Sequence, residues 1–99
     1  MSQSVIKKQQ FYTEQIKTLS SKSIILTVPN LNAKMHFCIM YSNAFAGIIM
    51  LDGTGNVWNN LGYEISTSIN GNTITITGNT LQYCWATIFS SYPFTATVG

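Results

Sequence analysis

The sequence contains very little charge. Of its 99 residues, five are lysines, three are acids and one is a histidine, and there is no arginine. Acid–base and nucleophilic catalysis depend on ionisable groups held close to one another. This chain has few such groups to bring together, so we expect that it is not an enzyme.

The scarcity of charge also excludes several kinds of partner. A formal net charge of +2 without arginine is too weak for the phosphate contacts by which proteins bind nucleic acid. No segment approaches the roughly 18 consecutive apolar residues of a membrane-spanning helix. Lys7 and Lys8 are not followed by the long apolar stretch of a signal peptide. We expect neither nucleic-acid binding nor a membrane span.

Metal and cofactor binding also lack their usual donors. The acids Glu14, Asp52 and Glu64 are far apart in the sequence, whereas calcium loops place several oxygen ligands at close spacing. The segment DGTGN at 52–56 is interpreted as a turn. His36 and Cys38 face the same side of an expected strand, but about 7 Å apart, which is too far for a hydrogen bond. The sequence predicts no catalytic residue, no metal site and no cofactor, and His36 is interpreted as a core-edge or interface residue.

The two cysteines, Cys38 and Cys84, each lie inside an apolar run. We interpret them as two buried thiols of a protein made in a reducing cytosol. A disulfide between them remains the alternative.

Alternation of apolar and polar residues is the strongest pattern that is present. In residues 63–77 the sequence reads YEISTSINGNTITIT, so isoleucine and threonine recur at every second position on each side of Asn70-Gly71. A period of two is typical of β-strands, and Asn-Gly favours tight hairpin turns. The segment therefore predicts a β-hairpin.

Further strands are expected at 23–28, 35–41, 45–51, 81–89 and 94–98, with turn residues between them. Residues 5–19 fit a helix or a strand, and we favour a strand over 10–18. These segments predict an all-β, antiparallel β-sandwich of jelly-roll or Greek-key type with seven or eight short strands, or a small barrel. Residues 1–9 are predicted to be an N-terminal arm, and 10–99 a single domain.

Three of the expected strands, 35–41, 45–51 and 81–89, are apolar on both faces. A strand at the surface of a monomer normally has one apolar and one polar face. We therefore predict a homo-oligomer in which another copy covers part of this surface. The predicted interface residues are Phe37, Ile39, Tyr41, Trp85 and Phe89.

Aromatic residues beside amides suggest where a sugar could bind, since flat rings stack on sugars and amides form uncharged hydrogen bonds. Two segments, 56–63 and 90–94, have this composition. The candidate ligand-binding residues are Trp58, Asn59, Asn60, Tyr63 and Tyr92. The alternative is that Trp58 and Tyr63 are core or interface residues.

Three segments of the chain read KSIILTVP at 22–29, INGNTITI at 69–76 and YCWATIF at 83–89. Together they resemble the small β-sandwich modules of tailed-bacteriophage virion proteins, such as tail-fibre tips, receptor-binding heads and head fibres. The resemblance covers residues 10–98 as a style of pattern. It implies a trimeric, non-enzymatic module that binds host-surface glycans or other virion proteins.

The expected function is therefore that of a non-enzymatic phage structural protein, displayed on the virion surface as a fibre, tail or capsid accessory module. It would be made in the host cytoplasm, attach to other virion proteins through the N-terminal arm, and form a homo-oligomer, with a trimer favoured by the resemblance. A stand-alone carbohydrate-binding module or lectin is the alternative.

Overall fold

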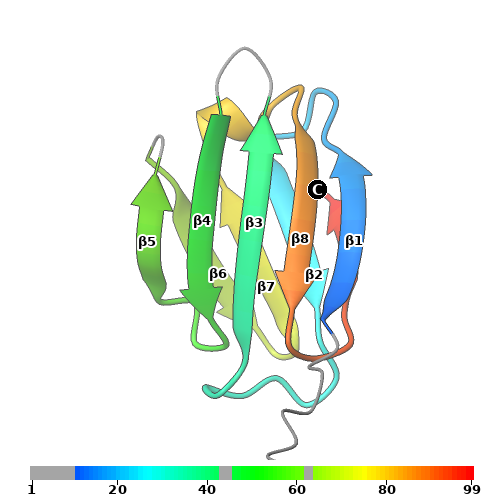
Figure 1. Cartoon of the computed structure of the whole chain (residues 1–99), viewed down its shortest axis with the longest axis vertical. Coiled ribbons are helices and arrows are strands. Elements are labelled where there is room, and N and C mark those ends of the chain that lie inside the picture. Colours follow the sequence, from blue (N-terminus) through cyan, green and yellow to red (C-terminus); the bar gives the residue numbers. More distant parts are fainter. Residues whose placement is uncertain (1–10, 43–45, 62–63) are drawn as a thin grey trace, which may run out of the picture.

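The computed structural model describes residues 11–42, 46–61 and 64–99, with only the backbone for residues 58–61. These ranges contain nine β-strands and one short 3-10 helix (Figure 1). The elements are β1 (Tyr12–Lys17), β2 (Ser23–Thr27), β3 (His36–Ser42), β4 (Ala46–Asp52), β5 (Val57–Leu61), β6 (Ser66–Asn70), β7 (Thr73–Thr77), η1 (Asn79–Leu81), β8 (Trp85–Ser90) and β9 (Thr95–Val98). The predicted all-β fold is confirmed, with nine strands where seven or eight were expected.

The strands form two antiparallel sheets packed face to face. One sheet has five strands in the order β1-β8-β3-β4-β5, and the other has four in the order β6-β7-β2-β9. Figure 1 shows the five-stranded sheet in front of the four-stranded one. The predicted antiparallel β-sandwich is therefore confirmed.

The strand order contains a Greek-key arrangement. Strands β3, β4 and β5 follow one another in the sheet, and β8 returns to lie beside β3 after β6 and β7 have formed in the other sheet. This is the spatial order 4-1-2-3 of a Greek key. In addition, β1 pairs with β8 while β2 pairs with β7, so the connections β1–β2 and β7–β8 both cross between the sheets.

Alternation of side chains places one face of each central strand in a common core. Strands β2 and β7 contribute Ile24, Leu26, Ile74 and Ile76, all fully buried. The five-stranded sheet contributes a larger set of buried residues, namely Phe37, Ile39, Tyr41, Ile49, Leu51, Ala86 and Ile88. Burial of these side chains from both sheets supplies the main stabilisation of the fold.

Three of the predicted interface residues, Phe37, Ile39 and Tyr41, therefore lie in the core of the protein's own sandwich. Each is 3% exposed or less. The ring of Phe37 packs edge-on against Phe94, with centroids 6.3 Å apart. The prediction that these three side chains contact another copy is wrong. The sequence shows that β3 has two apolar faces, but it does not show which one the second sheet covers.

The predicted hairpin is formed by β6 and β7. Ile69 pairs with Ile74, and Asn70 pairs with Thr73, so the two-residue loop is Gly71-Asn72. Gly71 has a φ of +61°, and no atom outside its chain neighbours lies within 4 Å of the position a Cβ would take. Glycine at the first loop position with positive φ is typical of a type II′ turn.

The expected strand at 81–89 begins later than predicted. Leu81 ends the 3-10 helix, Tyr83 has a left-handed φ of +57°, and β8 begins at Trp85. The reason is that the hydroxyl of a buried threonine, Thr18, makes the hydrogen bonds that a neighbouring strand would make here. The Thr18 hydroxyl accepts the Cys84 N–H at 2.8 Å and donates to the Leu81 carbonyl at 2.5 Å. These bonds hold the segment between η1 and β8 against the end of β1.

The structure decides between helix and strand near the N-terminus, and between free thiols and a disulfide for the two cysteines. Tyr12–Lys17 is a strand, as favoured over a helix, and the predicted arm at 1–9 lies outside the described residues. Cys38 and Cys84 are both free thiols, so the disulfide alternative is not realised. Cys84 is buried as predicted, and Cys38 is half-buried on the opposite face of the sheet.

Candidate functional site

The outer face of the five-stranded sheet is a regular grid of side chains. The strand registers align three rows of outward positions across β1, β8, β3 and β4, and a fourth row continues on β3 and β4 alone. From the upper end in Figure 1 the rows are Lys17-Trp85-Ser42-Ala46, Gln15-Thr87-Met40-Ile48, Thr13-Phe89-Cys38-Met50, and then His36 beside Asp52. We call these side chains, together with Phe11 at the lower end, the apolar face.

Large apolar side chains are exposed across this face. Trp85 is 60% exposed, Met40 47%, Met50 45% and Phe11 61%. Ile48 and Phe89 lie between them and are half-buried. Scattered exposed apolar residues are normal, but a contiguous apolar patch marks an interaction surface.

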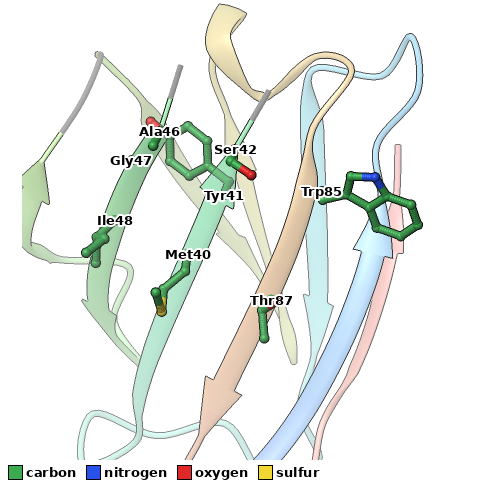
Figure 2. Close-up of a pocket in the computed structure, with 8 residues that line it drawn as sticks. All are labelled: Met40, Tyr41, Ser42, Ala46, Gly47, Ile48, Trp85 and Thr87. Carbon is green, nitrogen blue, oxygen red and sulfur yellow. The ribbon is translucent and has the colours of Figure 1, made fainter. Parts of the chain in front are cut away.

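The upper part of the apolar face is hollowed between β8, β3 and β4. This open hollow has a volume of about 640 Å³. Figure 2 shows Ile48, Met40 and Thr87 following one another across the three strands, with the Trp85 ring at the side of β1. The remaining lining residues are Tyr41, Ser42, Ala46 and Gly47. The hollow therefore combines an exposed indole with apolar side chains and the hydroxyl groups of Ser42 and Thr87.

A second, smaller hollow lies at the lower end of the same face, with a volume of about 180 Å³. It is lined mainly by Phe11, Cys38, Met50 and Phe89. Because hollows lie at both ends of the face with exposed methionines beside them, the surface has relief into which side chains of a partner can pack.

Tyr41 and Gly47 form a cross-strand pair beneath the upper hollow. The Tyr41 ring extends across β4 at Gly47, where a Cβ would overlap the ring (Figure 2). Its hydroxyl is buried and has no hydrogen-bond partner among the described residues. Glycine at position 47 is thus required for the ring to cover this part of the core.

Formal charge is confined to opposite corners of the grid. Lys17 stands at the upper end of β1, and its Nζ lies 5.1 Å from the centre of the Trp85 ring, within the range of a cation–π contact. Asp52 stands at the lower end of β4, in register with His36. The nine outward side chains of β8, β3 and β4 in the upper three rows carry no formal charge.

The Asp52 carboxylate organises the following turn, as the interpretation of 52–56 predicted. Its Oδ1 accepts the Thr54 N–H at 2.8 Å, the Thr54 hydroxyl at 2.5 Å and the Asn56 N–H at 3.2 Å. Within residues 11–42, 46–61 and 64–99, no three histidine, cysteine or acidic residues come together as a metal site would require. Glu14 lies on β1 and Glu64 precedes β6, whereas Asp52 ends β4.

His36 and Cys38 both belong to the outer face of β3, two residues apart, as the strand period predicted. Burial raises the pKa of the Cys38 thiol above its ordinary value of 9.0, and burial does the same for Cys84. A raised pKa leaves little thiolate at neutral pH, so neither cysteine has the activation of a catalytic nucleophile.

The predicted sugar-binding residues are only partly described. Trp58, Asn59 and Asn60 lie in the edge strand β5, not in a loop, and their side chains are outside the described residues, as is the whole of Tyr63. Tyr92 is 42% exposed in the β8–β9 connection.

Of the predicted interface residues, Trp85 and Phe89 lie on the apolar face. Three further residues of this face, Met40, Ile48 and Met50, were not predicted as site residues. The alternation pattern could have identified them, because each alternates with a buried residue on an apolar strand.

Leu19 and Tyr83, both exposed, were not predicted as site residues either. They have left-handed backbones and are joined by a hydrogen bond from the Tyr83 N–H to the Leu19 carbonyl.

Comparison of the chain with protein-family models, with curated proteins and with solved structures finds no match. Among the described residues, none of the helical segments has the length and apolar character needed to cross a membrane.

Proposed function

We propose that this chain is a non-enzymatic structural subunit of a larger assembly, and that the apolar face is the surface through which it assembles. The observation that carries this proposal is the exposure of Trp85, Met40 and Met50 on one continuous sheet face. Leaving such a surface in water costs roughly 25 cal/mol for each Å² of apolar area, and a partner that covers the face removes that cost.

The opposite surface of the sandwich supports the same proposal by contrast. We call the outward positions of β6, β7, β2 and β9 the hydroxyl face. Serine, threonine or asparagine occupies ten of them and Ile25 the eleventh: Ser66, Ser68, Asn70, Thr73, Thr75, Thr77, Ser23, Ile25, Thr27, Thr95 and Thr97. Such a surface hydrates well and needs no covering, so the two sheets differ in the way expected of a subunit with one buried and one solvent-facing side.

The proposed setting is a phage virion, in which the module is displayed as a fibre, tail or capsid accessory protein. This part rests on the resemblance of residues 22–29, 69–76 and 83–89 to virion β-sandwich modules. The resemblance also implies a trimer and attachment to other virion proteins through residues 1–9. The β-sandwich, the lack of charge and the apolar face are consistent with that setting.

Recognition of a host-surface glycan is a second candidate function. The upper hollow favours it, because the exposed Trp85 ring lies there with the hydroxyl-bearing side chains of Ser42 and Thr87. Aromatic rings and neutral hydroxyl groups are the usual contacts of a sugar. On a glycan array, Trp85→Ala is expected to abolish binding if the hollow is the site, and Trp58→Ala if the originally predicted segment is. Unchanged thermal stability of the variant would exclude a purely structural role for the ring.

The structural function is tested by asking whether the chain is a component of virus particles. The particles are taken from the culture that produces the chain. Particles are separated on a density gradient and probed with an antibody raised against the purified chain. We expect the chain to sediment with the particles, and a Met40→Ser/Met50→Ser variant to remain in the soluble fraction. A wild-type chain found only in the soluble fraction would contradict the proposal.

A further inference from the structure

We infer that the partner on the apolar face is a second copy of this chain, and that the two copies pack face to face with their strands crossed, so that Lys17 of each lies over Asp52 of the other. This inference rests on the proposed function, because it names the partner of the same surface, and it replaces the trimer that the resemblance implies with a two-fold pair. Three features of the apolar face support this pairing: its extent, the lack of charge in its middle, and the position of Lys17 and Asp52 at opposite corners.

The size of the face suits a pair of copies. Strands lie about 4.8 Å apart and rise about 3.4 Å per residue, so the four strands of the apolar face, with six or seven residues each, have a flat footprint on the order of 420 Å². Accessible surface follows the relief of the side chains and exceeds the flat footprint. Each partner in a stable complex of standard size buries roughly 800 Å², so the relief of the side chains makes the face large enough for a compact two-fold interface.

The distribution of charge favours self-association. A two-fold interface brings the same patch of both copies together, so the patch must be complementary to itself. The uncharged middle of the grid meets this condition, because apolar side chains from either copy can fill the hollows of the other. The corners meet it as well: a two-fold rotation that exchanges them places a lysine opposite an aspartate on both sides.

The same corners determine the orientation of the copies. Lys17 and Asp52 lie at the ends of one diagonal of the grid, so the rotation axis must run across that diagonal within the plane of the interface. Such an axis makes the strands of the two copies cross at a steep angle. This is nearer to the orthogonal class of sheet packing than to the aligned class. Cys38, on β3 beside the centre of the grid, then lies close to its counterpart.

A charge exchange between copies tests the orientation. Lys17→Glu alone places like charges at both corners, and so does Asp52→Lys alone. We expect each variant to weaken the association roughly tenfold or more by itself. A mixture of the two variants restores an opposite pair at both corners, and we expect it to associate with wild-type affinity. Thr75→Glu, on the hydroxyl face, is the matched control and is expected to leave the association unchanged.

Because the Asp52 carboxylate also holds the turn at 52–56, the melting temperature of Asp52→Lys is measured alongside. If this variant is unstable, Asp52→Asn replaces it, since its amide oxygen still accepts the backbone N–H groups of the turn. Combining Asp52→Asn with Lys17→Glu in one chain removes the repulsion. We expect this double variant to associate more strongly than Lys17→Glu alone.

Cross-linking gives an independent measurement. A short bis-maleimide is expected to join two wild-type chains through Cys38, because Cys84 is fully buried, and Cys38→Ser is expected to abolish the product. The inference is overturned by a monomeric or trimeric mass in light scattering, by a dimer without the Cys38 product, or by a charge-exchanged mixture that fails to associate. A chain that sediments with particles but is monomeric when purified would overturn the inference and leave the proposed structural function standing.

Discussion

The two sheets of this protein face solvent with different chemistry, although their inner faces are alike. Both contribute alternating, fully buried isoleucines to the core, such as Ile39 on β3 and Ile76 on β7. Between them, the outer positions of the five-stranded sheet include methionine, cysteine, tryptophan and phenylalanine, whereas those of the four-stranded sheet are mostly serine and threonine. Isoleucine alternating with threonine therefore indicates a strand with one apolar face. Isoleucine alternating with methionine indicates a strand with two, and we propose that a partner covers the outer one.

The largest expected effect is a difference in stability between substitutions on the inner and the outer face of β3. Ile39→Ala removes a fully buried side chain shared by both sheets, and we expect the free energy of unfolding to fall by about 2–5 kcal/mol. Met40→Ala, the next residue, removes an exposed side chain and is expected to cost less than about 1 kcal/mol in the monomer. Urea denaturation at low protein concentration measures both. Equal losses would mean that the apolar face is part of the monomer's own core.

Gly47→Ala is expected to destabilise the five-stranded sheet, because the new Cβ overlaps the Tyr41 ring. Overpacking of this kind typically costs about 1–3 kcal/mol. Gly71→Ala is the matched control in the four-stranded sheet, where the position is open and only the left-handed φ opposes the change, at about 1–2 kcal/mol. Thermal unfolding compares them. A loss below about 1 kcal/mol for Gly47→Ala would contradict the contact with Tyr41.

Thr18→Val is expected to lower the free energy of unfolding by about 1–3 kcal/mol. Valine keeps the shape but leaves the buried Cys84 N–H and Leu81 carbonyl without the hydroxyl. Thr27→Val makes the same change on the hydroxyl face, where the side chain is exposed, and is expected to stay within about 0.5 kcal/mol of the wild type. Similar effects of the two substitutions in chemical denaturation would exclude the role given to Thr18.

The smallest expected effect is a loss of stability at alkaline pH. Burial raises the pKa of Cys84 in the folded protein above its ordinary value of 9.0. The unfolded chain then loses this proton at a lower pH than the folded protein, so the contribution is complete below the ordinary pKa and is lost as the pH rises towards the folded pKa. Cys84→Ala is expected to make the stability curve flatter above pH 9. A curve as steep as that of the wild type would assign the alkaline loss to other groups.

Sequence alternation predicted the sandwich because tertiary contacts follow the local pattern in most strands. The β6–β7 hairpin is the clearest case, where the isoleucine period and a glycine turn agree. The pattern failed at 81–84, because the Cys84 N–H bonds to the Thr18 hydroxyl, 66 residues away in sequence, instead of to a neighbouring strand. Hydrogen bonds at such separations leave no local signal.

The exposed apolar surface was predicted in kind, but the residues predicted for it on β3 lie on the core side of that strand. The two-sided apolar character of 35–41 and 81–89 correctly indicated a surplus of apolar surface. The larger side chains, Phe37, Ile39 and Tyr41, were assigned to the interface, and the structure places them in the core. Alternation identifies two faces, and the choice between them depends on which face the second sheet covers.

Oxidation of the methionines tests most directly whether the apolar face is covered by a partner. Peroxide reacts with exposed methionine sulfur, so Met40 and Met50 report on the face, and Met35, 3% exposed, serves as an internal reference. With rising protein concentration we expect the oxidation rates of Met40 and Met50 to fall towards that of Met35. Rates that stay as fast as in a small peptide at every concentration, and in purified particles, would contradict the account.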